Sequence, residues 1–285
     1  MSKPILLEDR GAVEVAGPDA AKFLHDLVTN DIVSLAPGEA RYAALLAPQG
    51  KIVCDFLVFA VGSGDEPRFL LDCPRSLAPD LARRLAFYKL RAKIDIADIS
   101  GELAAFALLD AAEKPPINAL ALARDPRAPA LGWRGVAPIG AVATGGSRDD
   151  YDARRIAAGV PEGGADFAYG DAFPHEANMD LFAGLDFKKG CYVGQEVVSR
   201  MKHRGSVRKR VVPYRALGPA PAPGTPVVVG DAEICVTCSK SGDRGLALIR
   251  LDRLADALAK GERPFAGGTP LDFAEPGRQR GHDPA

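Results

Sequence analysis

The residues with the clearest chemical potential lie within residues 187–200, which read FKKGCYVGQEVVSR. Cys191 directly follows a pair of lysines, Lys188 and Lys189, and a glycine, and it precedes an expected helix that begins near Gln195. Neighbouring cations and a helix N-terminus both stabilise a thiolate, so Cys191 could be a nucleophile or a metal ligand. Alternatively, the lysines face solvent and Cys191 is a small buried hydrophobic residue. The spacing alone leaves both interpretations open.

Other motifs point less clearly to chemistry. Cys235 and Cys238 have the spacing of a metal or redox pair, but a structural zinc site needs four ligands and no second pair exists. On a strand, residues three apart also face opposite sides of the sheet. The four histidines lie in unrelated settings, so no Cys-His constellation can be assigned. The sequence therefore predicts no metal site.

Two further features each have a functional and a structural interpretation. The basic run in residues 200–210 could contact phosphates, or it could be a solvated connector, and it carries no aromatic residue on which a base could stack. Glu176 lies in an apolar loop, FPHEANMD, where its carboxylate could be solvated or could bind paired N–H donors. For both features the residues themselves favour the structural interpretation.

The composition excludes several classes of protein. The 285 residues are 47% hydrophobic and carry a formal net charge of -1, so no global field favours nucleic acid or membrane. No signal region or membrane-spanning stretch is apparent, and five cysteines without such a signal are expected to be reduced thiols. We therefore expect a soluble protein in the cytoplasm.

The elements that must position these residues alternate between helix and strand. Residues 17–32 predict an amphipathic helix followed by a polar loop at Asn30 and Asp31, because apolar side chains recur at helical spacing after Asp19. A hairpin turning at Gly50, a strand at residues 68–73, a helix over residues 76–93 and two more strands follow. Without a Gly-rich phosphate loop or regular βα spacing, this order favours an α+β fold.

The C-terminal part has a different pattern. Short strands with Pro and Gly turns follow one another beyond residue 208, which is typical of a small β-barrel or sandwich. We therefore predict one region over residues 1–208, a β-barrel domain over residues 209–276 and a disordered tail over residues 277–285.

Taken together, these segments resemble the folate-binding YgfZ family, relatives of the glycine-cleavage T-protein that are linked to iron–sulfur cluster maintenance. The family signature K-G-C-Y-x-G-Q-E is matched at every defined position by Lys189, Gly190, Cys191, Tyr192, Gly194, Gln195 and Glu196. The hairpin, the helix over residues 76–93 and the FPHEANMD loop also occur in the family's order. Residues 113–123 and the last dozen residues have no obvious counterpart.

The resemblance implies a ring of three lobes around a central channel: two interleaved α+β lobes and a C-terminal β-barrel. It also implies that tetrahydrofolate or a derivative binds in the channel, with Glu176 as pterin anchor and Asn30, Asp31 and Tyr192 along the wall. The T-protein carries an Asp-Asp pair after its hairpin, whereas this chain keeps one acid, Asp55. That difference weakens an aminomethyltransferase assignment.

The resulting hypothesis is a folate-binding accessory protein that supports assembly or repair of iron–sulfur clusters in client enzymes, including enzymes that thiolate tRNA. Cys191 would be its functional centre, as nucleophile, iron ligand or sulfur carrier, with Lys189 lowering its pKa. The loop would be shaped and oriented by the rest of the signature and the helix after it: Gly190, Gly194, Gln195, Glu196 and Arg200. A monomer without conventional turnover is expected, and its partners would be folate and iron–sulfur proteins. The alternatives are a folate-dependent one-carbon transferase that uses Asp55, and an RNA-binding module.

Overall fold

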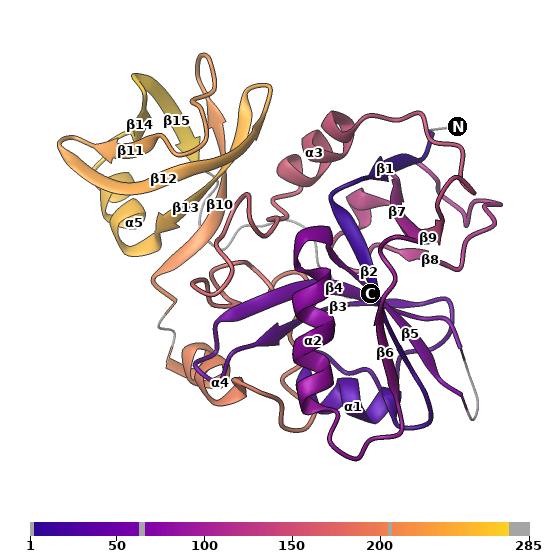
Figure 1. Ribbon diagram of the computed structural model, residues 1–285. Coiled ribbons are helices and arrows are strands. Elements are labelled where there is room, and N and C mark those ends of the chain that lie inside the picture. Colours follow the sequence, from indigo (N-terminus) through magenta and orange to yellow (C-terminus); the bar gives the residue numbers. More distant parts are fainter. Residues whose placement is uncertain (1–2, 63–65, 205–206, 274–285) are drawn as a thin grey trace.

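The computed structural model describes residues 3–62, 66–204 and 207–273, and it has three lobes (Figure 1). The predicted tail over residues 277–285 lies outside the described residues. Two lobes are antiparallel sheets with helices, and the third is a closed barrel. The predicted α+β class with a C-terminal β-barrel is confirmed. In the described part of the chain, no helix is long and apolar enough to cross a membrane.

The first lobe is a five-stranded sheet covered on one face by two helices. Its strand order is β3 (Ala40–Leu46), β4 (Ile52–Ala60), β5 (Arg68–Pro74), β2 (Arg10–Ala16) and β6 (Asp95–Asp98). The covering helices are α1 (Ala20–Leu27) and α2 (Ala78–Tyr88), which a 3₁₀ turn (Arg75–Leu77) precedes. The apolar face of α1 is the predicted one, because its four buried residues recur at helical spacing.

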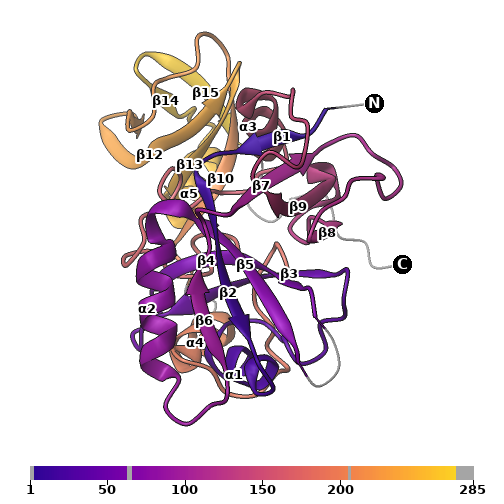
Figure 2. The same cartoon turned by 45° about the vertical axis from the view of Figure 1, so that its right-hand side comes forward.

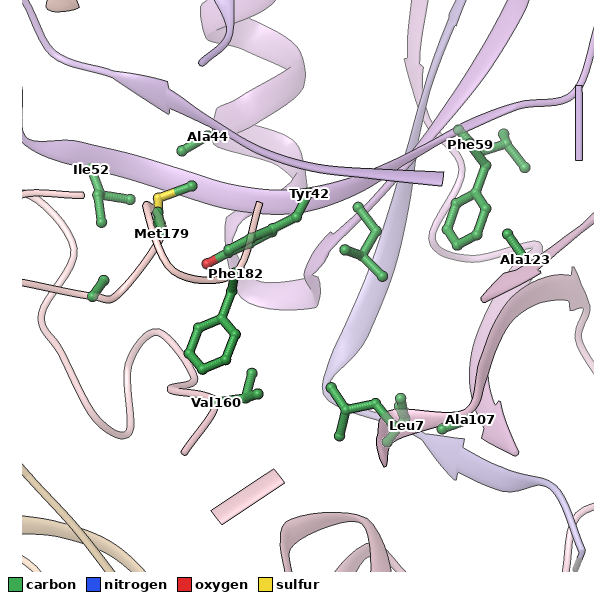
Figure 3. Packing of buried hydrophobic residues seen from close by; sticks show 14 of the residues in the cluster. Leu7, Tyr42, Ala44, Ile52, Phe59, Ala107, Ala123, Val160, Met179 and Phe182 are labelled. Atoms are coloured by element: carbon green, nitrogen blue, oxygen red, sulfur yellow. The ribbon is translucent and has the colours of Figure 1, made fainter. Parts of the chain in front are cut away.

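The second lobe is a four-stranded sheet interleaved with the first. Its order is β1 (Ile5–Leu7), β7 (Leu103–Leu108), β9 (Trp133–Pro138) and β8 (Ala121–Arg124), and a 3₁₀ turn (Pro129–Leu131) precedes β9. The chain therefore starts in this sheet, crosses to the first lobe at β2 and returns at β7. One hydrophobic cluster spans both sheets, and Figure 3 shows Tyr42, Met179 and Phe182 packed together within it.

A buried ion network also joins the two sheets. Asp72 on β5 accepts hydrogen bonds from Nε of Arg10 (2.8 Å) and from Nε of Arg134 on β9 (2.6 Å). Burial alone would raise the pKa of Asp72, but the two guanidinium groups hold it below its usual value. Because Asp72 and Arg134 are almost fully buried, removing one partner would leave a charge without compensation.

The barrel closes in the order β10 (Lys209–Ala216), β13 (Arg244–Arg250), β12 (Ala232–Ser241), β11 (Pro226–Val229), β14 (Phe265–Ala266) and β15 (Thr269–Phe273). Helix α5 (Leu251–Ala259) follows β13, while α3 (Arg148–Ala157) and α4 (Gln195–Arg204) precede the barrel. Arg155 on α3 donates to Ser239 Oγ on β12 (2.9 Å), and Arg210 on β10 binds both carboxylate oxygens of Asp180 (2.8 and 3.0 Å). Polar contacts therefore attach the barrel to the other lobes. Figure 2 shows α3 next to the barrel.

Candidate functional site

Residues 189–196, which we call the signature loop, are anchored at their start by Lys189. Its Nζ donates to the carbonyl oxygens of His25 and of Val28 (2.6 Å), at the C-terminal end of α1. These carbonyls have no partner inside the helix, and a cation near a helix C-terminus is favourable. Burial lowers the pKa of Lys189 to about 8, although nearby carboxylates oppose the shift. The structure thus gives Lys189 an anchoring role that the sequence did not predict.

Asp186 holds the turn just before this lysine. Its Oδ1 accepts from the backbone N–H groups of Lys188 (2.7 Å) and Lys189 (3.1 Å), and its own N–H donates to the carbonyl oxygen of Thr29 (3.0 Å). Such a side-chain-to-backbone pattern fixes a tight turn. The loop therefore starts from a fixed position against the segment that follows α1.

Gly194 fixes the other end of the loop against the β3–β4 hairpin. Its φ is +82°, and a Cβ added there would lie 2.7 Å from the carbonyl oxygen of Ala47. Gly50, at the tip of that hairpin, has φ +79°, and a Cβ there would lie 2.9 Å from Cβ of Val197 on α4. Glycine is needed at both positions because the two backbones approach closely in left-handed conformations. The sequence predicted each turn but not that they touch.

Between these two anchors Cys191 is exposed, whereas Cys54, Cys73, Cys235 and Cys238 are buried. Exposure excludes the interpretation of Cys191 as a small core residue, and it leaves the thiol accessible to a partner. Cys235 and Cys238 pack into two different hydrophobic clusters.

Tyr192, next to the thiol, points inward. It is 7% exposed, its hydroxyl has no hydrogen-bond partner among the described residues, and burial raises its pKa to about 12. Nζ of Lys189 lies 5.1 Å from the centre of its ring. The buried side chain of Tyr192 therefore anchors the loop to the protein interior, while Cys191 is exposed to solvent.

The rest of the signature is arranged around the start of α4. The N–H of Gln195 donates to the carbonyl oxygen of Tyr192 (3.2 Å). Glu196 and Arg200 form an exposed ion pair on the helix, and Gly190 is exposed with open space around it. An exposed pair of this kind contributes little stability. Gln195, Glu196 and Arg200 therefore form the start of α4 and its exposed surface, just after Cys191 in the chain.

Asn30 and Asp31 shape the segment on which Lys189 rests. Nδ2 of Asn30 donates to the carbonyl oxygens of Tyr42 (2.8 Å) and Ala183 (2.7 Å). Oδ1 of Asp31 lies 2.8 Å from Nδ1 of His25. Burial alone would raise the pKa of Asp31, but hydrogen bonds from Ser34 and the contact with His25 lower it. Both side chains are thus engaged within the protein.

Asp55, the single acid after the hairpin, is closed off from solvent. It is 5% exposed, and its two oxygens accept hydrogen bonds from the hydroxyls of Tyr42 (2.8 Å) and Tyr169. A general acid or base must reach a proton on its substrate. In this conformation Asp55 contacts two tyrosines instead.

Glu176 stabilises its own loop. Its Oε2 accepts from the N–H of Phe173 (2.9 Å), and its carbonyl oxygen accepts from the N–H of Val211 on β10 (3.0 Å). Within the described residues Oε1 has no hydrogen-bond partner. One carboxylate oxygen therefore remains for a ligand.

A cavity of about 650 Å³ lies between the two sheets and the segment that leads to the signature loop. Its walls combine aromatic, cationic and carboxylate side chains, among them Arg41, Tyr42, Arg124, Trp133 and Asp186, together with Asn30. Of the residues expected to bind folate, Asn30 is the one that lines it. The sequence did not predict the others because they come from three distant segments.

Three cations in the described part of the basic run, residues 200–210, have partners within the protein. Lys202 lies over the ring of Phe187 (3.5 Å), Arg210 binds Asp180, and Arg200 binds Glu196. The side chains of residues 204–206 lie outside the described part of the run. Since three of these cations already have protein partners, the connector interpretation is favoured over phosphate binding.

Comparisons with known proteins agree with this architecture. The family model "GCVT N-terminal domain" matches residues 7–110, and "CAF17, C-terminal beta-barrel domain" matches residues 208–279. A crystal structure of the glycine cleavage system aminomethyltransferase T from Bartonella henselae superposes with a TM-score of 0.75 at 16% identity, over 97% of this chain and 85% of that one. The predicted T-protein-like fold is therefore confirmed.

The sequence relatives carry a more specific name. A protein named "Iron-sulfur cluster assembly factor IBA57 homolog, mitochondrial" from Mycosarcoma maydis is 39% identical over 75% of this chain and 58% of its own length. "Iron-sulfur cluster assembly factor IBA57, mitochondrial" from Mus musculus is 34% identical over 88% of this chain and 78% of its own length. The human protein of that name is also 34% identical, over 88% and 78%.

These names correct one expectation and leave another untested. All three relatives are named as mitochondrial, which contradicts the cytoplasmic location expected from the sequence. The predicted link to iron–sulfur cluster assembly agrees with their names, while the narrower YgfZ assignment stays a prediction.

Proposed function

Because this chain belongs to the IBA57 family of iron–sulfur cluster assembly factors, we propose that it supports cluster assembly or repair in client proteins through Cys191. The observation that carries the proposal is the exposed thiol on a loop fixed at both ends. Clients that include tRNA-thiolating enzymes remain part of the proposal.

A single thiol limits what the chain can do alone. Iron–sulfur clusters are held by four protein ligands, usually cysteine thiolates. Across residues 3–62, 66–204 and 207–273, no group of three or more His, Cys, Asp or Glu side chains is placed to hold a metal ion. Cys191 would therefore supply one ligand to a cluster whose other ligands belong to a partner protein. The cluster is then cargo that passes between proteins.

The test replaces Cys191 by alanine and measures the activity of iron–sulfur enzymes in cells that lack the native gene. We expect Cys191→Ala to fail to restore these activities while its unfolding temperature stays within about 2 °C of wild type, since exposed substitutions change stability little. Cys235→Ala is the matched control, because it removes a thiol that is buried in the barrel. It should restore activity at a reduced unfolding temperature. Full complementation by Cys191→Ala would refute the proposal.

We also propose that tetrahydrofolate or a derivative binds in the 650 Å³ cavity. Its chemistry fits, because Trp133 lines the cavity with an aromatic side chain and the guanidinium group of Arg41 suits a carboxylate of a folate tail. When bound, the folate would supply a one-carbon carrier. The protein's own residues would bind and orient it.

Calorimetric titration with tetrahydrofolate tests this assignment. Arg41→Ala should weaken binding about tenfold, as expected for loss of one charged hydrogen bond. Glu176→Ala should also weaken binding if its remaining oxygen anchors the pterin. An unchanged affinity in Glu176→Ala would remove Glu176 from the site, and an unchanged affinity in Arg41→Ala would refute binding in this cavity.

A further inference from the structure

Three exposed hydrophobic residues lie in segments next to the two ends of helix α1. The three most exposed large hydrophobic residues in the described part of the chain are Leu90 (91%), Phe87 (81%) and Val33 (61%). Phe87 lies in the last turn of α2, Leu90 lies two residues after the end of that helix, and Val33 lies in the loop after α1. We call these three residues the α1-flanking patch. Single exposed apolar residues are ordinary, and what sets these three apart is that their segments contact the two ends of one short helix.

Hydrogen bonds attach both parts of the patch to α1. The N–H of Lys93 donates to Oδ2 of Asp19 (2.7 Å) at the N-terminal end of the helix, just after Leu90 in the chain. Asp31 contacts His25 in the last turn (2.8 Å) and accepts from the N–H of Val33 (3.0 Å). Since Asp19 and His25 are six residues apart, these attachments lie about 9 Å apart along the helix axis. One protein surface could cover both.

The signature loop is continuous with the same end of the molecule. Lys189 binds the carbonyl oxygens of His25 and Val28, so the loop meets α1 at its C-terminal end, on the side of Val33. Tyr88 and Val193 also pack on one hydrophobic cluster. Figures 1 and 2 both show α1, α4 and the C-terminal end of α2 together at the end of the molecule away from the four-stranded sheet.

The backbone at Leu90 argues that its side chain is not there for stability. Leu90 has φ +43°, in the left-handed region where glycine usually ends a helix. A leucine at this position is strained and yet buries almost none of its side chain. Folding of this lobe would be served as well or better by glycine. Contact with a partner accounts for both the strain and the exposure.

The charge around the patch indicates the chemistry of the partner. Residues 83–93 contain five Lys or Arg side chains and no Asp or Glu. Arg83 and Arg84 share Asp80, and Lys89 lies 3.8 Å from Asp95, whereas Arg91 and Lys93 form no ion pair with the described residues. A surface with apolar anchors and unpaired cations complements an acidic surface that carries an apolar pocket.

We propose that the α1-flanking patch is the docking surface for an acidic iron–sulfur partner protein, which supplies the remaining cluster ligands next to Cys191. The inference rests on the proposed function, because it places that partner at the thiol. In the complex Phe87 and Leu90 would be the buried anchors, Arg91 and Lys93 the rim, and Val33 the contact nearest to the thiol. Because the rim is exposed, binding should weaken as salt is added.

The test traps the partner at two separate positions of the full chain in cells. A photo-crosslinking amino acid replaces Phe87, and in a separate sample diamide oxidises Cys191 with a neighbouring thiol to a disulfide. We expect both traps to capture the same cysteine-containing protein. The matched control places the crosslinker at Ile139, which is 58% exposed just after β9, and it should not capture that protein.

Variants then measure how far docking depends on the patch. Phe87→Glu and Leu90→Glu should each reduce the yield of the Cys191 disulfide about tenfold, as expected when one anchor residue is lost. Ile139→Glu should not change it. Leu90→Gly should also reduce the yield while the unfolding temperature rises or stays constant, which separates docking from folding.

The outcomes distinguish this inference from the proposed function. If Cys191 captures a partner that the crosslinker at Phe87 does not capture, and Phe87→Glu and Leu90→Glu leave the disulfide yield unchanged, the docking surface is refuted and the proposed function stands. If Cys191 captures no cysteine-containing protein, both fail. Binding of wild type but not Phe87→Glu to phosphatidylglycerol vesicles or to RNA, with an unchanged disulfide yield, would overturn the inference in favour of that ligand.

Discussion

Replacing Gly194 by alanine tests whether the hairpin supports the signature loop. The left-handed backbone at φ +82° costs an alanine about 1–2 kcal/mol. Its Cβ would also lie 2.7 Å from the carbonyl oxygen of Ala47 and 3.1 Å from Cα of Gly50, so the two backbones must separate by several tenths of an ångström. Such overpacking adds about 1–3 kcal/mol. We expect a loss of about 2–5 kcal/mol in the free energy of unfolding.

Urea denaturation followed by the fluorescence of Trp133, the single tryptophan, measures this loss. The matched control is Gly170→Ala, because Gly170 has φ +78° and no atom within 4 Å of an added Cβ. It should lose about 1–2 kcal/mol from the backbone alone. The difference between the two variants isolates the close approach of the loop and the hairpin.

A second substitution examines the same contact from the other side. Gly50→Ala should be destabilising by a similar amount, and combining it with Gly194→Ala should cost less than the sum, because both disrupt one contact. The rate at which a thiol reagent modifies Cys191 should change in Gly194→Ala and not in Gly170→Ala. Equal stabilities for Gly194→Ala and Gly170→Ala would refute the reasoning.

Three further outcomes are expected. The pKa of Lys189 is about 8 in the fold against 10.5 for an unperturbed lysine, so the folded state binds fewer protons between these values. The stability of wild type relative to Lys189→Met should therefore rise between pH 8 and pH 10, by up to ~1.4 kcal/mol per pH unit. Urea denaturation of both proteins at several pH values measures this difference in stability. A difference that stays constant or falls as the pH rises would contradict the prediction. Tyr192→Phe removes a buried hydroxyl without a partner and should leave stability unchanged or raise it by about 1 kcal/mol. Tyr42→Phe removes a hydrogen bond to Asp55 and should lower the free energy of unfolding by about 1–3 kcal/mol. A loss of the same size in Tyr192→Phe would show that the Tyr192 hydroxyl has a hydrogen-bond partner.

The sequence predicted the local features that depend on neighbouring residues. The period of apolar side chains predicted α1 and its buried face, and the hairpin turn at Gly50 was predicted from turn chemistry. The signature around Cys191 was recognisable because its fixed residues are contiguous. Its resemblance also predicted the T-protein-like fold and the link to iron–sulfur assembly.

The tertiary structure decided what each of these residues touches. Lys189 binds the end of a helix about 160 residues earlier, Gly194 meets the tip of the hairpin, and Asp55 is enclosed by two tyrosines. The exposure of Cys191 could likewise not be read from spacing. These outcomes depend on packing between distant segments, and a local pattern carries no information about which distant segment will cover it.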